Sequence, residues 1–469
     1  MPLCIPAFGR HRAVLTILVV ILIGLGCNER KSNAINLPSP PSEWKGDPAT
    51  NADPQNWLAD FNDEQLPLLV QEALKQNWNL RLVAARLQAA GALARIEGAN
   101  VYPEAALNLD SSKSQRIFNS GAVRRAIKST DFGLNLRVVW EADIWSRLKD
   151  DRRAANQEFQ AAQADFAAAR LSLAALVARN WFGLISARKQ EELAAKTVES
   201  FQGSLVAIMR RAEGGTLSLV DLRLAKAEVA SAKSRLEGRR RELDSARRSF
   251  ETVLGRYPAS ELKERNTLPT MARVVPTGIP SQLLNRRPDM IAAKLELEAS
   301  RSRLKGERKN RLPALRLTGT GGTSTDAFQD LLNSNFLIWN IAAGFSQPIF
   351  NAGRLKARVS LAEAQKDEAI AEYAGAALIA FREVESALKD EEFLKKQETA
   401  LQEAVTESKA AEAKALSDYV EGLVDIITLL TTQRRTFQVQ SDLIGIQSLL
   451  LQNRVGLYLA LGGGFDVMT

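Results

Sequence analysis

The sequence predicts a mainly α-helical protein with a small β part, in which one arrangement of helices and strands occurs twice. Three features lead to this prediction: long helical stretches without proline, landmarks that recur after 208 residues, and paired segments in which apolar and polar residues alternate. The chain has 469 residues, of which 45% are hydrophobic and 25% charged. This is a globular composition with enough apolar residues for a sizeable core.

The longest helical stretch covers residues 353–461, which include none of the 16 prolines of the chain. It predicts two helices joined by a sharp break at Tyr419-Val420-Glu421-Gly422. After the break, an apolar residue stands at every seventh position: Leu423, Leu430, Phe437, Ile444, Leu451 and Tyr458. Such a column keeps facing one neighbour only if the helices wind around each other. We therefore expect a long antiparallel hairpin, suited to a rod or to the wall of a tube.

The landmarks of this stretch recur at a constant offset of 208 residues, which indicates an internal duplication. The break at Glu213-Gly214 corresponds to Glu421-Gly422, and Asn77 corresponds to Asn285. An equivalent heptad column stands at Leu222, Val229, Leu236, Leu243 and Phe250. Chance similarity between coiled coils explains the heptads, but it does not explain the shared break and flanks.

Each copy also contains two strand-like segments. In the first copy, apolar residues alternate with mostly polar ones at Phe132, Leu134, Leu136, Val138 and Trp140, and less cleanly over residues 105–109. Alternation with a period of two places one face of a strand in an apolar environment and the other in water. The second copy has equivalent segments at 315–320 and 336–350. We expect residues 117–128 to form an exposed loop.

Four strands per chain cannot close a membrane barrel, because lipid does not tolerate open strand edges and such barrels start at about eight strands. Several chains must therefore share one barrel. Three chains would give twelve strands and a tube of twelve helices, although this argument leaves two or four chains open.

The N-terminus predicts export. Arg10-His11-Arg12 precede an apolar run, residues 13–25, that is too short for a spanning helix and is typical of a secretory signal. Small residues before Cys27 indicate lipoprotein processing, which would leave Cys27 as the acylated first residue. Gly24 is atypical for that pattern, so an uncleaved anchor and cleavage without lipid remain alternatives.

These features divide the chain into five regions. We expect a signal peptide at 1–26, a lipidated tether at 27–57, a first repeat at 58–258, a linker at 259–280 and a second repeat at 281–469. Each repeat reads as short helices, two strands and a long helical hairpin. The only histidine, His11, and Cys4 leave with the signal, so no metal site, cofactor, disulfide or enzymatic nucleophile is expected.

The order of the motifs resembles the TolC-like outer-membrane efflux proteins, in the lipoprotein subgroup that serves resistance–nodulation–division tripartite systems. The matching segments cover nearly the whole mature chain: Trp57-Leu-Ala-Asp-Phe61, Trp140-Glu-Ala-Asp-Ile-Trp-Ser-Arg147, Ile279-Pro-Ser-Gln-Leu-Leu-Asn-Arg-Arg-Pro-Asp289, Gln347-Pro-Ile-Phe350, Phe381-Arg-Glu-Val-Glu-Ser-Ala-Leu388, Tyr419-Val-Glu-Gly422 and Leu461-Gly-Gly-Gly-Phe465. The resemblance implies a homotrimer with a twelve-stranded barrel, an α-helical periplasmic tunnel, and docking to a periplasmic adaptor and an inner-membrane pump. A type I secretion duct and an elongated periplasmic coiled-coil adaptor are the alternatives.

The two hairpin tips are the candidate docking surfaces, because the family joins its tips to the adaptor. The residues concerned are Arg210, Gly214, Gly215, Thr216, Ser218, Asp221, Glu421 and Gly422. The plainer interpretation is that the glycines only supply the turns.

The family closes its tunnel near the second tip, often with an aliphatic ring and an aspartate ring about one turn apart. Ile427 matches the aliphatic position, but Thr431 stands where the closest pattern has the aspartate. Asp425 could supply the charge instead, since rings of carboxylates attract cations. The equal alternative is an Ile427 that packs against a helix and a solvated Asp425.

Two other motifs are interpreted as structural. Arg286-Arg287-Pro288-Asp289 is typical of a helix start, and Gly319-Thr-Gly-Gly322 lacks the spacing of a phosphate loop and is expected at a barrel rim. The net charge of +8 is spread along helices that also carry acids, so nucleic-acid binding is not expected.

Overall fold

A computed structural model describes residues 44–45, 57–120, 123–213, 219–271, 275 and 280–463. All of them belong to one unit of the chain, residues 38–469. The predicted signal peptide, Cys27 and most of the tether lie outside the described residues.

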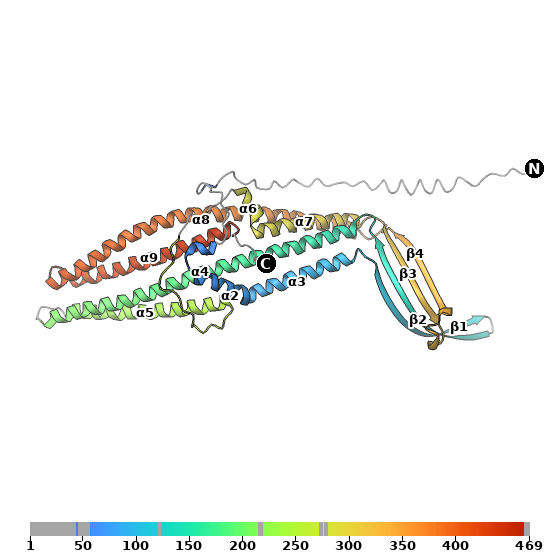
Figure 1. Ribbon diagram of the computed structural model, residues 1–469, viewed down its shortest axis with the longest axis horizontal. Helices are drawn as coiled ribbons and strands as arrows, with labels where there is room; N and C mark the ends of the chain where they lie inside the picture. The colour runs from blue at the N-terminus through green and yellow to red at the C-terminus, as the bar shows by residue number, and fades with distance from the viewer. Residues whose placement is uncertain are drawn as a thin grey trace, which may run out of the picture. The chain divides into compact units, whose positions relative to one another are not determined.

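The described helices and strands repeat in the predicted order (Figure 1). The first series consists of η1 (Trp57–Phe61), α2 (Gln65–Gln76), α3 (Trp78–Ala99), β1 (Glu104–Ser120), β2 (Val123–Ala142), α4 (Arg147–Glu213) and α5 (Leu219–Leu254). The second consists of α6 (Pro280–Arg286), α7 (Pro288–Lys309), β3 (Ala314–Thr325), η2 (Phe328–Asp330), η3 (Ser334–Phe336), β4 (Leu337–Ser346), α8 (Arg354–Glu421) and α9 (Ile426–Ala460). The long helices α4 and α8 have 67 and 68 residues.

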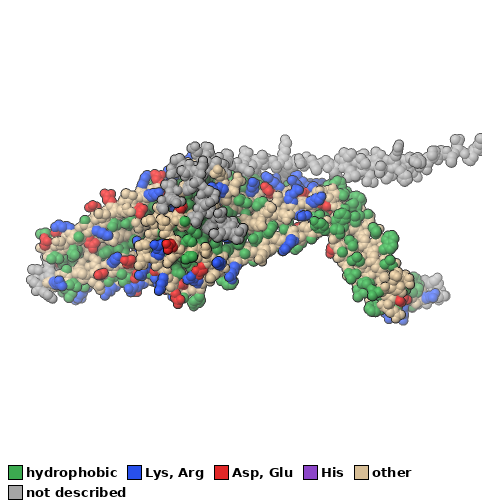
Figure 2. Space-filling model, viewed as in Figure 1, with side chains coloured by type: hydrophobic (Ala, Val, Ile, Leu, Met, Phe, Trp, Pro, Cys, Tyr) green, Lys and Arg blue, Asp and Glu red, His purple; other side chains and the backbone are tan. Residues whose placement is uncertain are grey.

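The strands form one antiparallel sheet in the order β1-β2-β3-β4. Its register places Leu107 opposite Leu136, which in turn stands opposite Gly321 and, beyond it, Trp339. Apolar side chains on this face are exposed, with 70% of Leu107 and 72% of Trp339 accessible. Figure 2 shows hydrophobic side chains over the visible side of the strands, in contrast to the mixed charges of the helices.

The opposite face of the sheet is polar. The Asn108 amide nitrogen donates to Asn135 Oδ1 at 3.2 Å, and the Asn135 amide nitrogen donates to Asp110 Oδ1 at 3.1 Å. The predicted alternation is therefore confirmed in the strands. Strands β1 and β4 have one partner each, so both outer edges of the sheet are open in the single chain.

Two expectations about the sheet were wrong. Residues 117–120 and 123–128 are not a loop, because β1 and β2 stay paired from Ile117↔Ala126 out to Ser120↔Val123. Gly319–Gly322 lies within β3 rather than at a strand end. A Cβ atom on Gly322 would lie 2.0 Å from the carbonyl oxygen of Leu134, so this position requires glycine for the close approach of β2.

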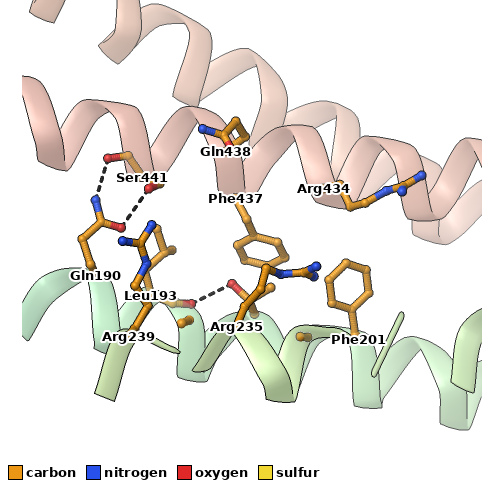
Figure 3. A pocket seen from close by; sticks show the side chains of 12 residues that line it. Gln190, Leu193, Phe201, Arg235, Arg239, Arg434, Phe437, Gln438 and Ser441 are labelled. Atoms are coloured by element: carbon orange, nitrogen blue, oxygen red, sulfur yellow. Dashed lines mark hydrogen bonds between the residues drawn. The ribbon is translucent and has the colours of Figure 1, made fainter. Parts of the chain in front are cut away.

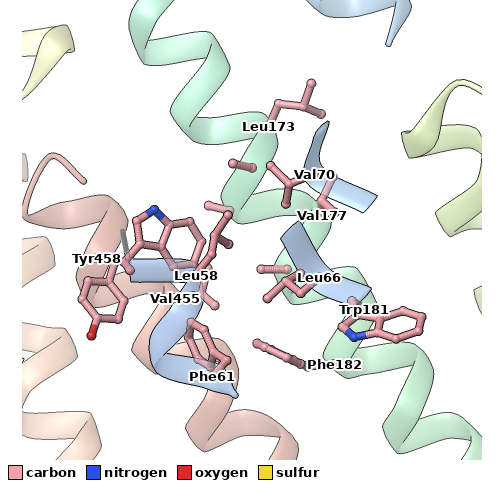
Figure 4. Packing of buried hydrophobic residues seen from close by; sticks show 14 of the residues in the cluster. Leu58, Phe61, Leu66, Val70, Leu173, Val177, Trp181, Phe182, Val455 and Tyr458 are labelled. Carbon is pink, nitrogen blue, oxygen red and sulfur yellow. The ribbon is translucent and has the colours of Figure 1, made fainter. Parts of the chain in front are cut away.

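Helix α4 packs against α2, α3, α5, α7 and α9. The centre of this packing is an aromatic cluster (Figure 4) in which Trp57 stacks on Tyr458 at 5.6 Å and Phe61 lies 5.0 Å from Phe182. All four side chains are at most 1% exposed. Burying each of them stabilises the fold by about 1.5–3 kcal/mol. Although α4 is long and apolar enough to cross a membrane by composition, these contacts are those of a core helix.

Most side chains of the heptad columns are buried or half-buried, with one exception. In α9 the column begins at Leu430, which is 5% exposed, and continues to Tyr458. Leu423 is 69% exposed because it lies in the turn before the helix begins. In α5 Leu222 is half-buried, and the column is buried from Val229 to Phe250.

The motif at 286–289 does start a helix, as predicted. Pro288 is the first residue of α7, and Asp289 lies in its first turn. Burial would raise the pKa of Asp289, but the hydrogen bond and charge of Arg287 outweigh it and hold that pKa below its usual value.

Candidate functional site

The second hairpin tip is a tightly capped turn. Gly422 adopts φ 84°, which only glycine reaches without strain, and ends α8. Its N–H donates to the Tyr419 carbonyl at 3.1 Å, and the Leu423 N–H donates to the Asp418 carbonyl at 2.8 Å. These two bonds satisfy carbonyls at the helix end in a Schellman motif. The turn role of Gly422 is thus explained by its backbone.

Asp425 caps the helix that leaves this turn. Its carboxylate accepts a hydrogen bond from the Thr428 N–H at 2.7 Å. Hydrogen bonds from Thr428 lower the pKa of Asp425, so the group is ionised at neutral pH. The side chain is exposed, and its observed contact is that of a helix cap.

Ile427 and Thr431 lie one turn apart on the exposed side of α9. Ile427 is 60% exposed, whereas its neighbour Ile426 is 3% exposed and packs in the hairpin core. The Thr431 hydroxyl accepts from the Arg434 guanidinium at 3.4 Å. More than half of the Ile427 side chain is therefore accessible in the single chain.

The first tip is described only at its flanks. Gly214, Gly215, Thr216 and Ser218 lie outside the described residues. Arg210 is exposed in the last turns of α4, and Asp221 is half-buried in the first turn of α5. At the second tip, Glu421 is exposed and accepts from the Ser417 hydroxyl at 3.1 Å. The candidate docking residues that are described thus have exposed or half-exposed side chains.

About two turns into α9, a buried polar layer joins the two hairpins. The Gln433 amide, 2% exposed, donates to Ser204 Oγ at 2.8 Å and to Ser200 Oγ at 3.0 Å, both on α4. Ser200 in turn donates to Glu412 Oε1 on α8 at 3.3 Å. Burial raises the pKa of Glu412, although these hydrogen bonds oppose the rise. The sequence analysis did not predict this layer. The available signal was Gln433, a polar residue at a helix position that is usually buried and apolar.

Next to the polar layer, a groove of about 230 Å³ opens between α4, α5 and α9 (Figure 3). Its floor includes Phe201 and Phe437, whose rings lie 6.0 Å apart. Arg235 and Arg434 also line it, and both point to Glu228, at 3.8 and 3.4 Å. This acid compensates much of the local positive charge, so the groove is only weakly basic.

Among the described residues, no group of three or more His, Cys, Asp or Glu side chains has the arrangement of a metal site. The features that remain are geometric: an amphipathic sheet with open edges, long hairpins, and tips with exposed side chains. These features suit a conduit.

Comparisons with known proteins point the same way. The family model described as outer membrane efflux protein matches residues 69–256 and 279–463, which is most of the chain and one match for each repeat. Outer membrane protein OprJ of Pseudomonas aeruginosa is 30% identical over 98% of this chain and 97% of its own length. The pyoverdine export outer membrane protein OpmQ of Pseudomonas putida is 29% identical over 91% of this chain and 93% of its own.

A solved structure has the same fold. The outer-membrane channel OprN superposes with a TM-score of 0.84 and 26% sequence identity, over 92% of this chain and 98% of that one. The similarity covers both the helical hairpins and the sheet.

Proposed function

We propose that this chain, which belongs to the family of outer membrane efflux proteins, conducts substrates passively from an inner-membrane transporter and a periplasmic adaptor to the cell exterior. Members of the family are trimeric outer-membrane channels in tripartite efflux systems. The proposed role includes no catalysis, since the transporter would supply the energy.

The observation that carries this proposal is the sheet. One face presents exposed Leu107, Trp339 and Ile341, while the other carries the amides of Asn108 and Asn135. An apolar outer face and a polar inner face are what a membrane barrel needs. An elongated periplasmic adaptor is surrounded by water and would not expose an apolar sheet face, so the sheet disfavours that alternative.

The open edges of β1 and β4 support a shared barrel. Unpaired N–H and C=O groups cost several kcal/mol each in hydrocarbon, so each edge must pair with another chain. Three chains of four strands give twelve strands, which lies within the range of known outer-membrane barrels. The same threefold axis would arrange the hairpins α4–α5 and α8–α9 as a tunnel wall.

The tips are the proposed contact with the adaptor. Arg210, Asp221 and Glu421 provide charges of both signs at the ends of the hairpins, and exposed rim charges mainly guide the orientation of a partner. Ile427 is proposed as the narrowest point of the tunnel, with Thr431 one turn further along and Asp425 fixed as a cap.

Lipid anchoring at Cys27 is part of the proposal. Replacement Cys27→Ser should give a folded protein that is unprocessed or poorly retained in the membrane, because serine lacks the sulfur that forms the thioether to the diacylglyceryl group. Metabolic labelling with a radioactive fatty acid would check it. Normal acylation and membrane yield of the variant would remove the lipoprotein claim.

Planar-bilayer recording tests the channel itself. The purified oligomer should insert and give small, mostly closed currents, and Ile427→Gly should raise single-channel conductance because it removes the constriction. Ile379→Gly is the matched control, since Ile379 is an exposed isoleucine of α8 and the change costs a similar helix propensity. A wild-type oligomer that never inserts would refute the channel. An unchanged current for Ile427→Gly would refute only the constriction.

A further inference from the structure

We propose that the outer end of the β1–β2 hairpin binds phosphate-bearing headgroups of lipids in the outer leaflet, through two lysines on its lipid-facing side. We name residues 113–120 of β1 and 123–130 of β2 the hairpin extension. The inference rests on the proposed function, because that function sets the membrane around the sheet.

The hairpin extension continues beyond the ends of the other strands. Pairing between β2 and β3 stops at Phe132↔Thr325, whereas β1 and β2 remain paired out to Ser120↔Val123. Figure 1 shows these two strands passing the ends of β3 and β4. Since β1 follows α3 and β2 leads into α4, the extension lies at the end of the sheet that is away from the helices. With the helices in the periplasm, it lies on the outer side of the membrane.

The charge of the hairpin extension has one sign. It contains five basic residues and no acidic residue: Lys113, Arg116, Arg124, Arg125 and Lys128. Of these, Lys113, Arg116, Arg125 and Lys128 have exposed side chains, and none of the four forms an ion pair within the described part of the chain. Elsewhere the bases stand beside acids along the helices. A concentrated field of uncompensated cations attracts anionic partners.

Of the four exposed cations, the register assigns two to the lipid-facing side. Side chains alternate between the faces of a strand, so Lys113 lies on the same face as Leu107 and Leu109. Across the hairpin, Lys128 stands opposite Gln115, which is also on this face. The two ammonium groups therefore continue the oil-facing side of the barrel beyond its apolar band.

The two arginines provide an internal contrast. Arg116 stands opposite Ile127, and Arg125 stands opposite Phe118, on the face that continues the polar interior. They carry the same charge in the same hairpin but point away from the lipid. A lipid site should therefore depend on the lysines and not on these arginines.

The height of the lysines fits a headgroup layer. Lys113 follows Leu109 by four residues, which is about 13 Å along a strand and about 10 Å along the membrane normal at a tilt of about 40°. Headgroup regions begin directly outside the hydrocarbon core. A lysine stem of four carbons can reach back toward that layer and keep its ammonium at the phosphates. Charge and position thus both select an anionic lipid.

The test is native mass spectrometry of the delipidated, detergent-solubilised oligomer. The probes are lipid A with both phosphates and the same glycolipid after removal of its phosphates. The wild type should bind the phosphorylated form preferentially. Lys113→Gln/Lys128→Gln should weaken this binding roughly 10- to 30-fold at low salt, the magnitude for losing two lysines at an anionic surface. Arg116→Gln/Arg125→Gln is the matched control and should bind as the wild type does.

Each outcome decides the proposal. Equal losses in both double variants would show unspecific charge attraction and overturn the lipid-facing site, as would equal binding of the two glycolipids by the wild type. Channel insertion is measured on the same preparations. If all the proteins insert and conduct alike, but Lys113→Gln/Lys128→Gln binds the phosphorylated lipid A as tightly as the wild type, this inference alone fails. If the wild type does not insert, the proposed function fails with it.

Discussion

In each repeat, a side chain connects the end of the shorter hairpin helix, α5 or α9, to the start of a neighbouring helix, α3 or α7. The two repeats use different side chains for this connection. In the first repeat, the Asn77 amide donates to the Val253 carbonyl at 2.8 Å, while its oxygen caps α3 by accepting from the Leu80 N–H at 3.0 Å. In the second repeat, Arg287 precedes α7 and donates to the Ala460 carbonyl at 3.1 Å. A neutral amide and a guanidinium thus perform one task, capping the last carbonyls of α5 and α9.

The difference lies in what else each group holds. The Asn77 side chain hydrogen-bonds to two backbone groups, whereas Arg287 also pairs with Glu383 of α8 and with Asp289, each at 2.6 Å. Arg287 is 8% exposed, so its charge depends on these partners. Both repeats therefore keep a connection between the same two helix ends. The connection in the second repeat joins α7, α8 and α9, and it depends on the ionised carboxylates of Asp289 and Glu383.

The largest expected effect is at the charged junction. Arg287→Met should destabilise the helical region by about 3 kcal/mol, because it leaves the buried Ala460 carbonyl without its donor and two half-exposed carboxylates without their charged partner. Urea unfolding followed by circular dichroism in detergent would measure it. Arg301→Met, an exposed position of the same helix, is the control and should stay within about 0.5 kcal/mol of the wild type. Equal effects of the two changes would contradict the anchoring role.

The neutral junction should give a smaller effect. Asn77→Ala removes a helix cap and a buried hydrogen bond, so we expect a loss of about 1–2 kcal/mol in the same unfolding experiment. Asn79→Ala tests the neighbouring exposed amide and should be nearly neutral. If Asn77→Ala costs as much as Arg287→Met, charge is not what distinguishes the junctions.

The smallest effect should be a difference in acid sensitivity. Asp289 has a lowered pKa in the folded protein, so its contribution to stability is present above its unfolded value near 3.9 and is lost as pH falls through the folded value. Between about pH 4 and 2, the wild type should therefore lose more stability than Arg287→Met, in which that pKa is no longer held down. If the wild type and Arg287→Met lose the same amount of stability over this pH range, Arg287 does not lower the pKa of Asp289.

Much of the fold follows from local sequence patterns. The breaks at Glu213-Gly214 and Glu421-Gly422, the buried columns of α5 and α9, and the alternation around Leu136 all have short-range signals. The hairpin extension was missed because its strands carry lysine and arginine where the period-two pattern needs apolar residues. Asn285 was matched to Asn77 by the offset, yet α7 starts two residues later and Arg287 takes over the junction.

The candidate site was harder to predict. Gln433 meets Ser200 and Ser204 across more than 220 residues of chain, and Arg287 meets Ala460 across 173, so no local pattern reveals these pairs. Tip residues follow from the break between helices, but the docking and gating roles proposed for them involve other molecules, which no local pattern in one chain reveals. Ile427 illustrates the limit: its 60% exposure agrees with the proposed constriction, which three chains would form together.

The measurement that tests the central claim most directly is the mass of the purified, detergent-solubilised oligomer by native mass spectrometry. The open edges of β1 and β4 and the family membership predict three copies of the chain, which together close a twelve-stranded barrel. A homogeneous monomer or dimer that remains stable in detergent would contradict the shared barrel, and with it the account of how the sheet, the hairpins and the tips work together.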